Sequence, residues 1–156
     1  MAFLEQTRIP IRIDISFGDV IRPKPNEVDF PTLLGFPSPK IKTYPQETVI
    51  AEKFHAVTDL GMTNSRLKDF YDLYILTTNF EINRESLLEA ISATFERRNT
   101  KIPTTSPIAL TDEFSNDASR SVQWKSFLKK TNVSQEIKFN TVIKTVNKFF
   151  AELLGY

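Results

Sequence analysis

The stretch that most constrains the fold is residues 66–76, because it is apolar on nearly every face of the helix that it predicts. A helix of this kind lies in the centre of a protein. Asp69 and Asp72 nevertheless lie on it, separated by about 60° around the helix axis. Carboxylates on a mostly buried helix need cations beside them, because an unpaired buried charge is costly. Lys53 and Arg66 are the obvious candidates.

The preceding helix, predicted over residues 45–61, carries Lys53 near the middle of its apolar side. We expect this lysine to meet a carboxylate or an anionic ligand, because a buried ammonium without a partner is destabilising. Alternatively, its stem covers apolar surface while the ammonium reaches water. The carboxylates and cations together fit two interpretations, a structural ion pair that locks two helices or an active-site wall that faces phosphates.

The rest of the pattern predicts an α+β protein, with a short strand or hairpin followed by a helical bundle. Residues 8–17 alternate, so we expect a strand whose isoleucines are buried. Six prolines make residues 23–45 an extended connector with a possible strand near 40–44, in which Leu33, Leu34 and Phe36 act as packing contacts. Further helices are predicted from Asn64 or Ser65, from Asn83, from Thr111 to about Leu128, and over 136–154. The expected domains are a β-rich segment, 1–44, and a helical domain, 45–156.

Composition excludes several kinds of site. The 156 residues contain no cysteine, so disulfides, thiolate metal sites and cysteine nucleophiles are excluded. The single histidine, His55, falls on the polar side of its helix and is interpreted as a surface residue. No apolar run is long enough to span a membrane and no signal sequence is evident, so we expect a cytoplasmic protein. Residues 118–148 carry a net charge of +6, which suits either nucleic acid or a solvated lysine face.

Asp14 lies on the polar face of the predicted strand, between Arg12 and Ser16. An aspartate near a sheet edge is a common magnesium ligand, although two further oxygen ligands are usually needed. The alternative is a solvated polar face without a metal.

Several stretches of the chain together resemble the AbiEii/AbiGii toxin family of nucleotidyltransferases. They are residues 13–19, 44–56 and 64–74, with further similarity at 93–98 and 124–130. The resemblance implies a polymerase-β-like nucleotidyltransferase sheet followed by a helical domain. It also implies a toxin of a bacterial toxin–antitoxin or abortive-infection system, paired with a DNA-binding antitoxin. Some members transfer a nucleotide from a nucleoside triphosphate to tRNA ends, with magnesium as the implied cofactor.

The resemblance also implies roles for individual residues. Asp14 corresponds to the strand-borne third carboxylate of the metal triad, and is therefore the implied metal ligand. Lys53 corresponds to the helical lysine that contacts nucleotide phosphates. Asp69 and Asp72, with Arg66 and Lys68, match the motif Lys-Asp-x-x-Asp. We therefore predict catalytic roles for Asp14, Lys53 and Asp69, and substrate-binding roles for Arg66, Lys68 and Asp72.

The sequence departs from the family pattern at its start. It contains neither the Gly-Gly or Gly-Ser motif nor the Asp-x-Asp motif, which hold the triphosphate and two of the metal carboxylates. The chain thus resembles the C-terminal portion of such an enzyme, and we expect it to be inactive alone and completed by an N-terminal half. The alternative is a non-catalytic remnant that forms a homodimer or binds the antitoxin.

Overall fold

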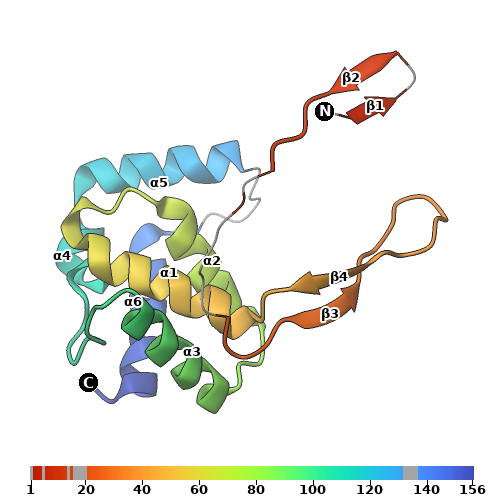
Figure 1. Cartoon of the computed structure of the whole chain (residues 1–156). Coiled ribbons are helices and arrows are strands. Elements are labelled where there is room, and N and C mark those ends of the chain that lie inside the picture. The colour runs from red at the N-terminus through yellow and green to blue at the C-terminus, as the bar shows by residue number, and fades with distance from the viewer. Residues whose placement is uncertain (1, 5, 14, 16–20, 132–136) are drawn as a thin grey trace.

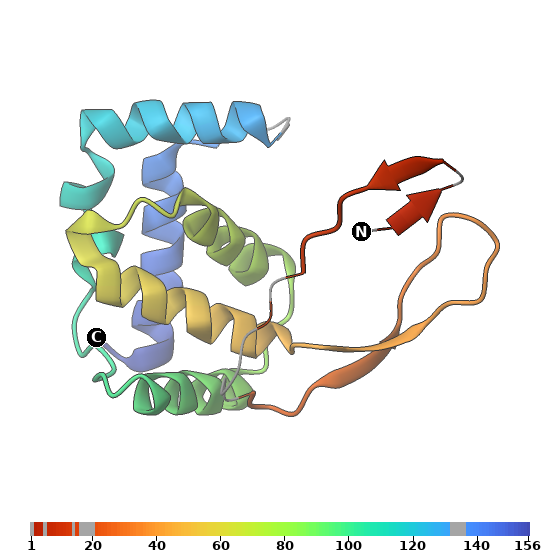
Figure 2. The same cartoon turned by 45° about the horizontal axis from the view of Figure 1, so that its top comes forward.

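The computed structural model describes residues 2–4, 6–13, 15, 21–131 and 137–156 of the chain. The fold is α+β, as the sequence predicts: two β-hairpins precede a bundle of α-helices (Figure 1). The first hairpin pairs β1 (Ala2–Leu4) with β2 (Thr7–Ile9), and the second pairs β3 (Asn26–Asp29) with β4 (Lys40–Thr43), both antiparallel. The two hairpins lie on the same side of the bundle (Figures 1 and 2).

The predicted strand over residues 8–17 is much shorter in the structure. Within the described residues β2 ends at Ile9, and the isoleucines beyond it are not buried. Ile11, Ile13 and Ile15 are 56%, 77% and 73% exposed. The physical reason is that these isoleucines follow the end of β2, where the described residues form no strand pairing and no second layer that would cover an apolar face. The prediction of a buried isoleucine face is therefore wrong.

The second hairpin confirms the strand expected near 40–44 but adds β3, which the sequence analysis did not predict. Val28 pairs with Ile41 in its register. The loop at its tip closes on itself, since Phe30 donates its amide hydrogen to the carbonyl of Pro39 at 2.9 Å. Leu33, Leu34 and Phe36 lie in this loop and are exposed, so the prediction that they are packing contacts is wrong.

The helices form a bundle around one core. They are α1 (Gln46–Leu60), α2 (Leu67–Asn79), α3 (Arg84–Arg97), α4 (Asp112–Ser115), α5 (Ala118–Lys130) and α6 (Phe139–Leu154), with 3-10 turns η1 (Gly61–Thr63) and η2 (Ile108–Leu110). α1 packs on α3 and α2, and α2 packs on α6. Figure 2 shows α6 passing behind α1, with α5 near one end of α6 and α3 near its other end. No helix in the described part of the chain is long and apolar enough to cross a bilayer.

Aromatic rings join the helices in this core. Phe54 of α1 stacks on Phe150 of α6 with ring centroids 3.7 Å apart. Phe70 of α2 contacts Phe114 and Phe139, at 5.4 and 5.7 Å. The buried positions of α6 follow the helical spacing that the sequence shows, because one stripe of this helix faces its neighbours.

The helix predicted from Thr111 is two helices in the structure. Thr111 caps α4, which is only one turn long, and Asp117 then adopts an extended backbone, with φ −60° and ψ 121°. The Asp117 carboxylate accepts hydrogen bonds from the amides of Ser119 and Arg120, at 2.8 and 3.2 Å. This second N-cap starts α5 in a new direction, which hydrophobic spacing alone did not reveal.

Candidate functional site

The predicted residues of α1 and α2 meet in one cluster of ion pairs. The Nζ atom of Lys53 lies 2.9 Å from Oδ1 of Asp69 and 2.6 Å from Oδ2 of Asp72. Nε of Arg66 lies 2.7 Å from Oδ2 of Asp69, and Nζ of Lys68 lies 2.6 Å from Oδ2 of Asp72. Lys53 thus pairs with both carboxylates, as a structural ion pair between the two helices requires. We call these five residues the charged cluster; three cations surround two carboxylates.

The inner half of the charged cluster is buried and the outer half is exposed. The side chains of Asp69 and Lys53 are 4% and 18% exposed, whereas those of Arg66 and Lys68 are 59% and 72% exposed. Burial disfavours the charged form of Lys53, but the hydrogen bonds and charges of Asp72 and Asp69 outweigh it and raise the pKa of Lys53. Lys53 is therefore a cation at physiological pH, and the cluster carries an excess of one positive charge.

The loop that carries Arg66 is held by Asn64 within it and by Arg120 of α5. Asn64 is buried, and its side-chain oxygen accepts a hydrogen bond from the amide of Arg66 at 2.8 Å. Arg120 of α5 donates to the carbonyl of Asn64 at 2.6 Å and also to the carbonyl of Met62. The guanidinium of Arg120 lies over the ring of Phe114, 3.7 Å from its centroid. Arg120 is thus a positioning residue for the loop before α2.

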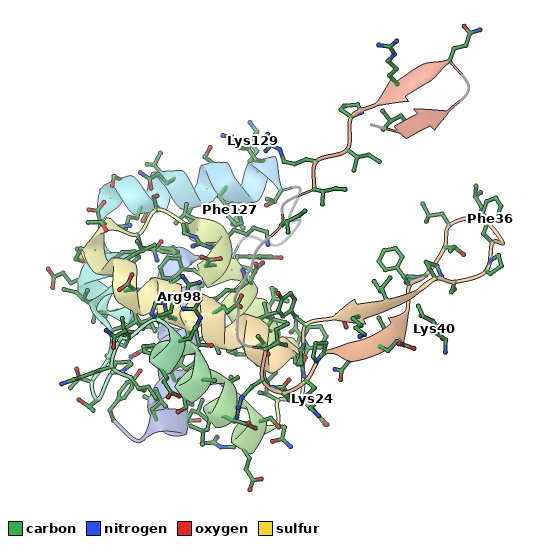
Figure 3. The ribbon with its side chains drawn as sticks, in the orientation of Figure 1. Lys24, Phe36, Lys40, Arg98, Phe127 and Lys129 are labelled. Carbon is green, nitrogen blue, oxygen red and sulfur yellow. The ribbon has the colours of Figure 1, made fainter. Side chains whose placement is uncertain are left out.

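A cavity of about 310 Å³ opens on one side of the charged cluster, between α1 and the C-terminal end of α3. We call it the α1–α3 cavity. Lys53, Arg66 and Arg98 supply its cations, and Glu52 and Asp59 supply its carboxylates. Figure 3 shows Arg98 beside α1. Its cations come from three separate segments, so they converge only in the folded protein.

His55 is buried, so its interpretation as a surface residue is wrong. Its Nε2 lies 2.9 Å from the hydroxyl of Thr100, and its ring packs edge-on against Phe95, with centroids 4.8 Å apart. The helical wheel missed this because α3 and the turn after it cover the side of α1 that lies away from the other apolar residues. Burial lowers the pKa of His55, with a smaller opposing contribution from Asp59 and a lowering one from Arg98.

The described residues do not form a divalent-cation site. Within the described ranges no three histidine, aspartate or glutamate side chains come close enough to hold a metal ion. Asp69 and Asp72 do lie close together, but Lys53 contacts both of them, so their charge is already compensated. Asp14, the predicted magnesium ligand, lies outside the described residues.

A comparison with protein families identifies the family of the chain. Residues 1–145 match the model of the family described as "Nucleotidyl transferase AbiEii toxin, Type IV TA system". The chain belongs to the AbiEii family. It is accordingly a nucleotidyltransferase-like toxin of a type IV toxin–antitoxin system. The partners that the family suggests are a cognate antitoxin and a nucleotide substrate. Neither a curated protein nor a solved structure matches the chain.

In this AbiEii member, two arginines that sequence reasoning missed adjoin the predicted residues. Arg98 lines the α1–α3 cavity and Arg120 anchors the loop before Arg66. Arg98 lies within a stretch quoted for the family resemblance, but nothing in its spacing connects it with Lys53. Arg120 was counted only as part of the positive stretch 118–148, although its guanidinium points inward to the loop carbonyls. Both depend on contacts between segments far apart in the sequence.

Proposed function

We propose that the charged cluster and the α1–α3 cavity bind the phosphates of a nucleoside triphosphate for nucleotidyl transfer. The observation that carries the proposal is the convergence of Lys53, Arg66 and Arg98 on one cavity, beside carboxylates that fix the lysine and one arginine. Guanidinium groups recognise phosphates through paired donors, and a lysine adds a point charge. Asp69 and Asp72 orient these cations, and Lys68 extends the positive surface outward.

The finer parts of the proposal derive from the family. We propose that the nucleotide is transferred to an acceptor such as tRNA in the cytoplasm, with magnesium as the divalent ion and Asp14 as one of its ligands. The charged cluster supplies phosphate binding rather than metal ligands. Since the sequence lacks the Gly-rich and Asp-x-Asp motifs, we propose that transfer also needs a polypeptide segment that supplies them.

Nucleotide binding is the direct test, because it does not require complete catalytic machinery. Isothermal titration of the full chain with each of the four nucleoside triphosphates should reveal binding. Arg66→Ala and Arg98→Ala should each weaken that binding about tenfold, the loss expected for a charged hydrogen bond. Arg84→Ala is the matched control, since Arg84 bonds the carbonyl of Glu152 on another part of the bundle. Equal binding by all three variants would contradict the proposal.

A second candidate function is an interaction module. The exposure of Ile13, Ile15, Leu33, Leu34 and Phe36 favours it, because apolar side chains on one side of a protein often mark a contact surface. A homodimer or the antitoxin would cover them. Light scattering on the wild type and on Leu34→Asp tests the dimer: a concentration-dependent mass that the substitution abolishes supports it, and a monomer at high concentration argues against it.

A further inference from the structure

A second and larger cavity lies on the other side of Arg66. It measures about 830 Å³ and runs between the start of α2 and one face of α5. We call it the α2–α5 groove. Arg66, Lys68 and Asp69 form its α2 side, and Gln123, Ser126, Phe127 and Lys130 belong to its α5 side. Arg66 is the residue that lines both cavities, so two ligands could approach the charged cluster from opposite sides.

The charge of the α2–α5 groove favours an anion. Three cationic side chains, Arg66, Lys68 and Lys130, line it, against the single carboxylate of Asp69. That carboxylate already contacts Lys53, which lies outside the groove lining. Lys130 is exposed, and Lys68 is 72% exposed although its Nζ also lies 2.6 Å from Asp72, so a ligand in the groove can reach both ammonium groups. The spread of these charges along the groove matches a ligand with more than one anionic group.

The groove also has an apolar wall with a fixed ring. Phe127 is half-buried and is held by Tyr71 and Trp124, at centroid distances of 5.9 and 5.4 Å. Val122 beside it is 68% exposed despite being apolar. A planar ring can stack on such a wall, whereas inorganic phosphate would leave it uncovered.

Anionic groups and a planar ring occur together in a nucleotide unit of a polynucleotide. Such a ligand matches both the cations and the apolar wall of the groove.

We propose that the α2–α5 groove binds the end of a single-stranded RNA, with phosphates at Lys68 and Lys130 and a base against Phe127. This proposal rests on the proposed function, because it makes the groove the acceptor site and the α1–α3 cavity the nucleoside triphosphate site. Arg66 then lies between the two substrates. A second protein chain is a poorer occupant, because the apolar wall is small and is flanked by cations.

The test is fluorescence anisotropy of a 5′-labelled RNA octamer of mixed sequence with the full chain. Lys130→Gln should weaken binding about fivefold and lower the salt dependence, since one phosphate contact in a single strand contributes about 0.7 to its slope. Lys129→Gln is the matched control: the same charge is removed one residue away, and Lys129 does not line the groove. Figure 3 shows Phe127 on the side of α5 that faces α2 and Lys129 on the outer side.

Phe127→Ala tests the stacking wall and should weaken RNA binding about fivefold or more. Lys130→Gln keeps the test decisive even where Phe127→Ala perturbs folding, which circular dichroism would reveal. Equal losses in Lys129→Gln and Lys130→Gln would overturn the proposal, because they would indicate general charge attraction. Absence of RNA binding by the wild type would overturn it too.

Nucleoside triphosphate titration of the same variants separates this proposal from the previous one. Lys130→Gln should bind nucleoside triphosphate like the wild type. If Arg66→Ala and Arg98→Ala leave that binding intact while Lys130→Gln still loses RNA, the α1–α3 assignment fails and the groove remains an RNA site.

Discussion

Lys53 of α1 and Asp69 of α2 form a salt bridge, with Nζ 2.9 Å from Oδ1, in which the carboxylate side chain is only 4% exposed. The pair joins the two helices that carry the family motifs, and Asp72 contacts the same ammonium. A charge pair of this kind is costly to break from one side, because the remaining partner stays buried without compensation. The pair therefore holds the two helices together. It also places the Lys53 ammonium in the lining of the α1–α3 cavity.

A double-mutant cycle measures this coupling. Lys53→Met should lower the free energy of unfolding by about 3 kcal/mol, the usual cost of removing one partner of a buried pair. The double variant with Asp69→Asn should cost less than the two single changes added together, by about 1–3 kcal/mol. Urea denaturation measures each value. Lys148 and Glu152 provide the control, because their exposed pair at 3.8 Å should couple by less than about 0.5 kcal/mol.

The charged cluster shows what helical periodicity can predict. Lys53 breaks the apolar side of one helix and the aspartates break the next, so their need for each other follows from the cost of buried charge. The alternation of residues 8–17 was less informative. A period of two indicates that apolar side chains lie on one face of a strand, but it does not indicate whether another layer covers that face. The burial of His55 and the positions of Arg98 and Arg120 depend on contacts between distant segments. A helical wheel drawn for one helix does not contain these contacts. The roles of the site residues stay predictions.

Arg120 should affect nucleotide binding only through Arg66. Arg120→Met removes the donors to the carbonyls of Met62 and Asn64 and should lower the free energy of unfolding by about 2 kcal/mol. It should also weaken nucleoside triphosphate binding, because the loop before Arg66 loses its anchor. Isothermal titration of Arg66→Ala with and without Arg120→Met checks the route. An undiminished effect of Arg120→Met in the Arg66→Ala background would show that the loop does not act through Arg66.

His55 should make the fold sensitive to mild acid. Burial lowers the pKa of His55 in the folded protein, so below the ordinary histidine pKa of about 6.5 the unfolded chain binds more protons and stability falls. Urea midpoints at about pH 7.5 and about pH 5.5 measure the loss, in a range where histidine is the side chain that ordinarily titrates. His55→Gln keeps a hydrogen-bonding partner for Thr100 and should lose less stability between these two values. An identical loss would show that His55 is not its source.

The helical domain, residues 45–156, should carry nearly all of the stability of the chain. Phe150 is fully buried and stacks on Phe54, so Phe150→Ala should lower the free energy of unfolding by about 3–5 kcal/mol. Leu33, at the tip of the second hairpin, is as exposed as in an extended chain. Leu33→Lys should therefore change the free energy of unfolding by less than about 0.5 kcal/mol.

Comparing Phe150→Ala with Leu33→Lys separates the effect of an apolar side chain in the core from that of an exposed one. Urea denaturation of both variants, followed through Trp124, reports on the bundle because this tryptophan is buried beside Phe139. A large loss in Leu33→Lys would mean that the hairpin tip is covered in solution, which would favour the interaction module. Repeating the measurement at several protein concentrations identifies the cover, because a self-associated chain becomes more stable as its concentration rises, whereas a contact within one chain does not change.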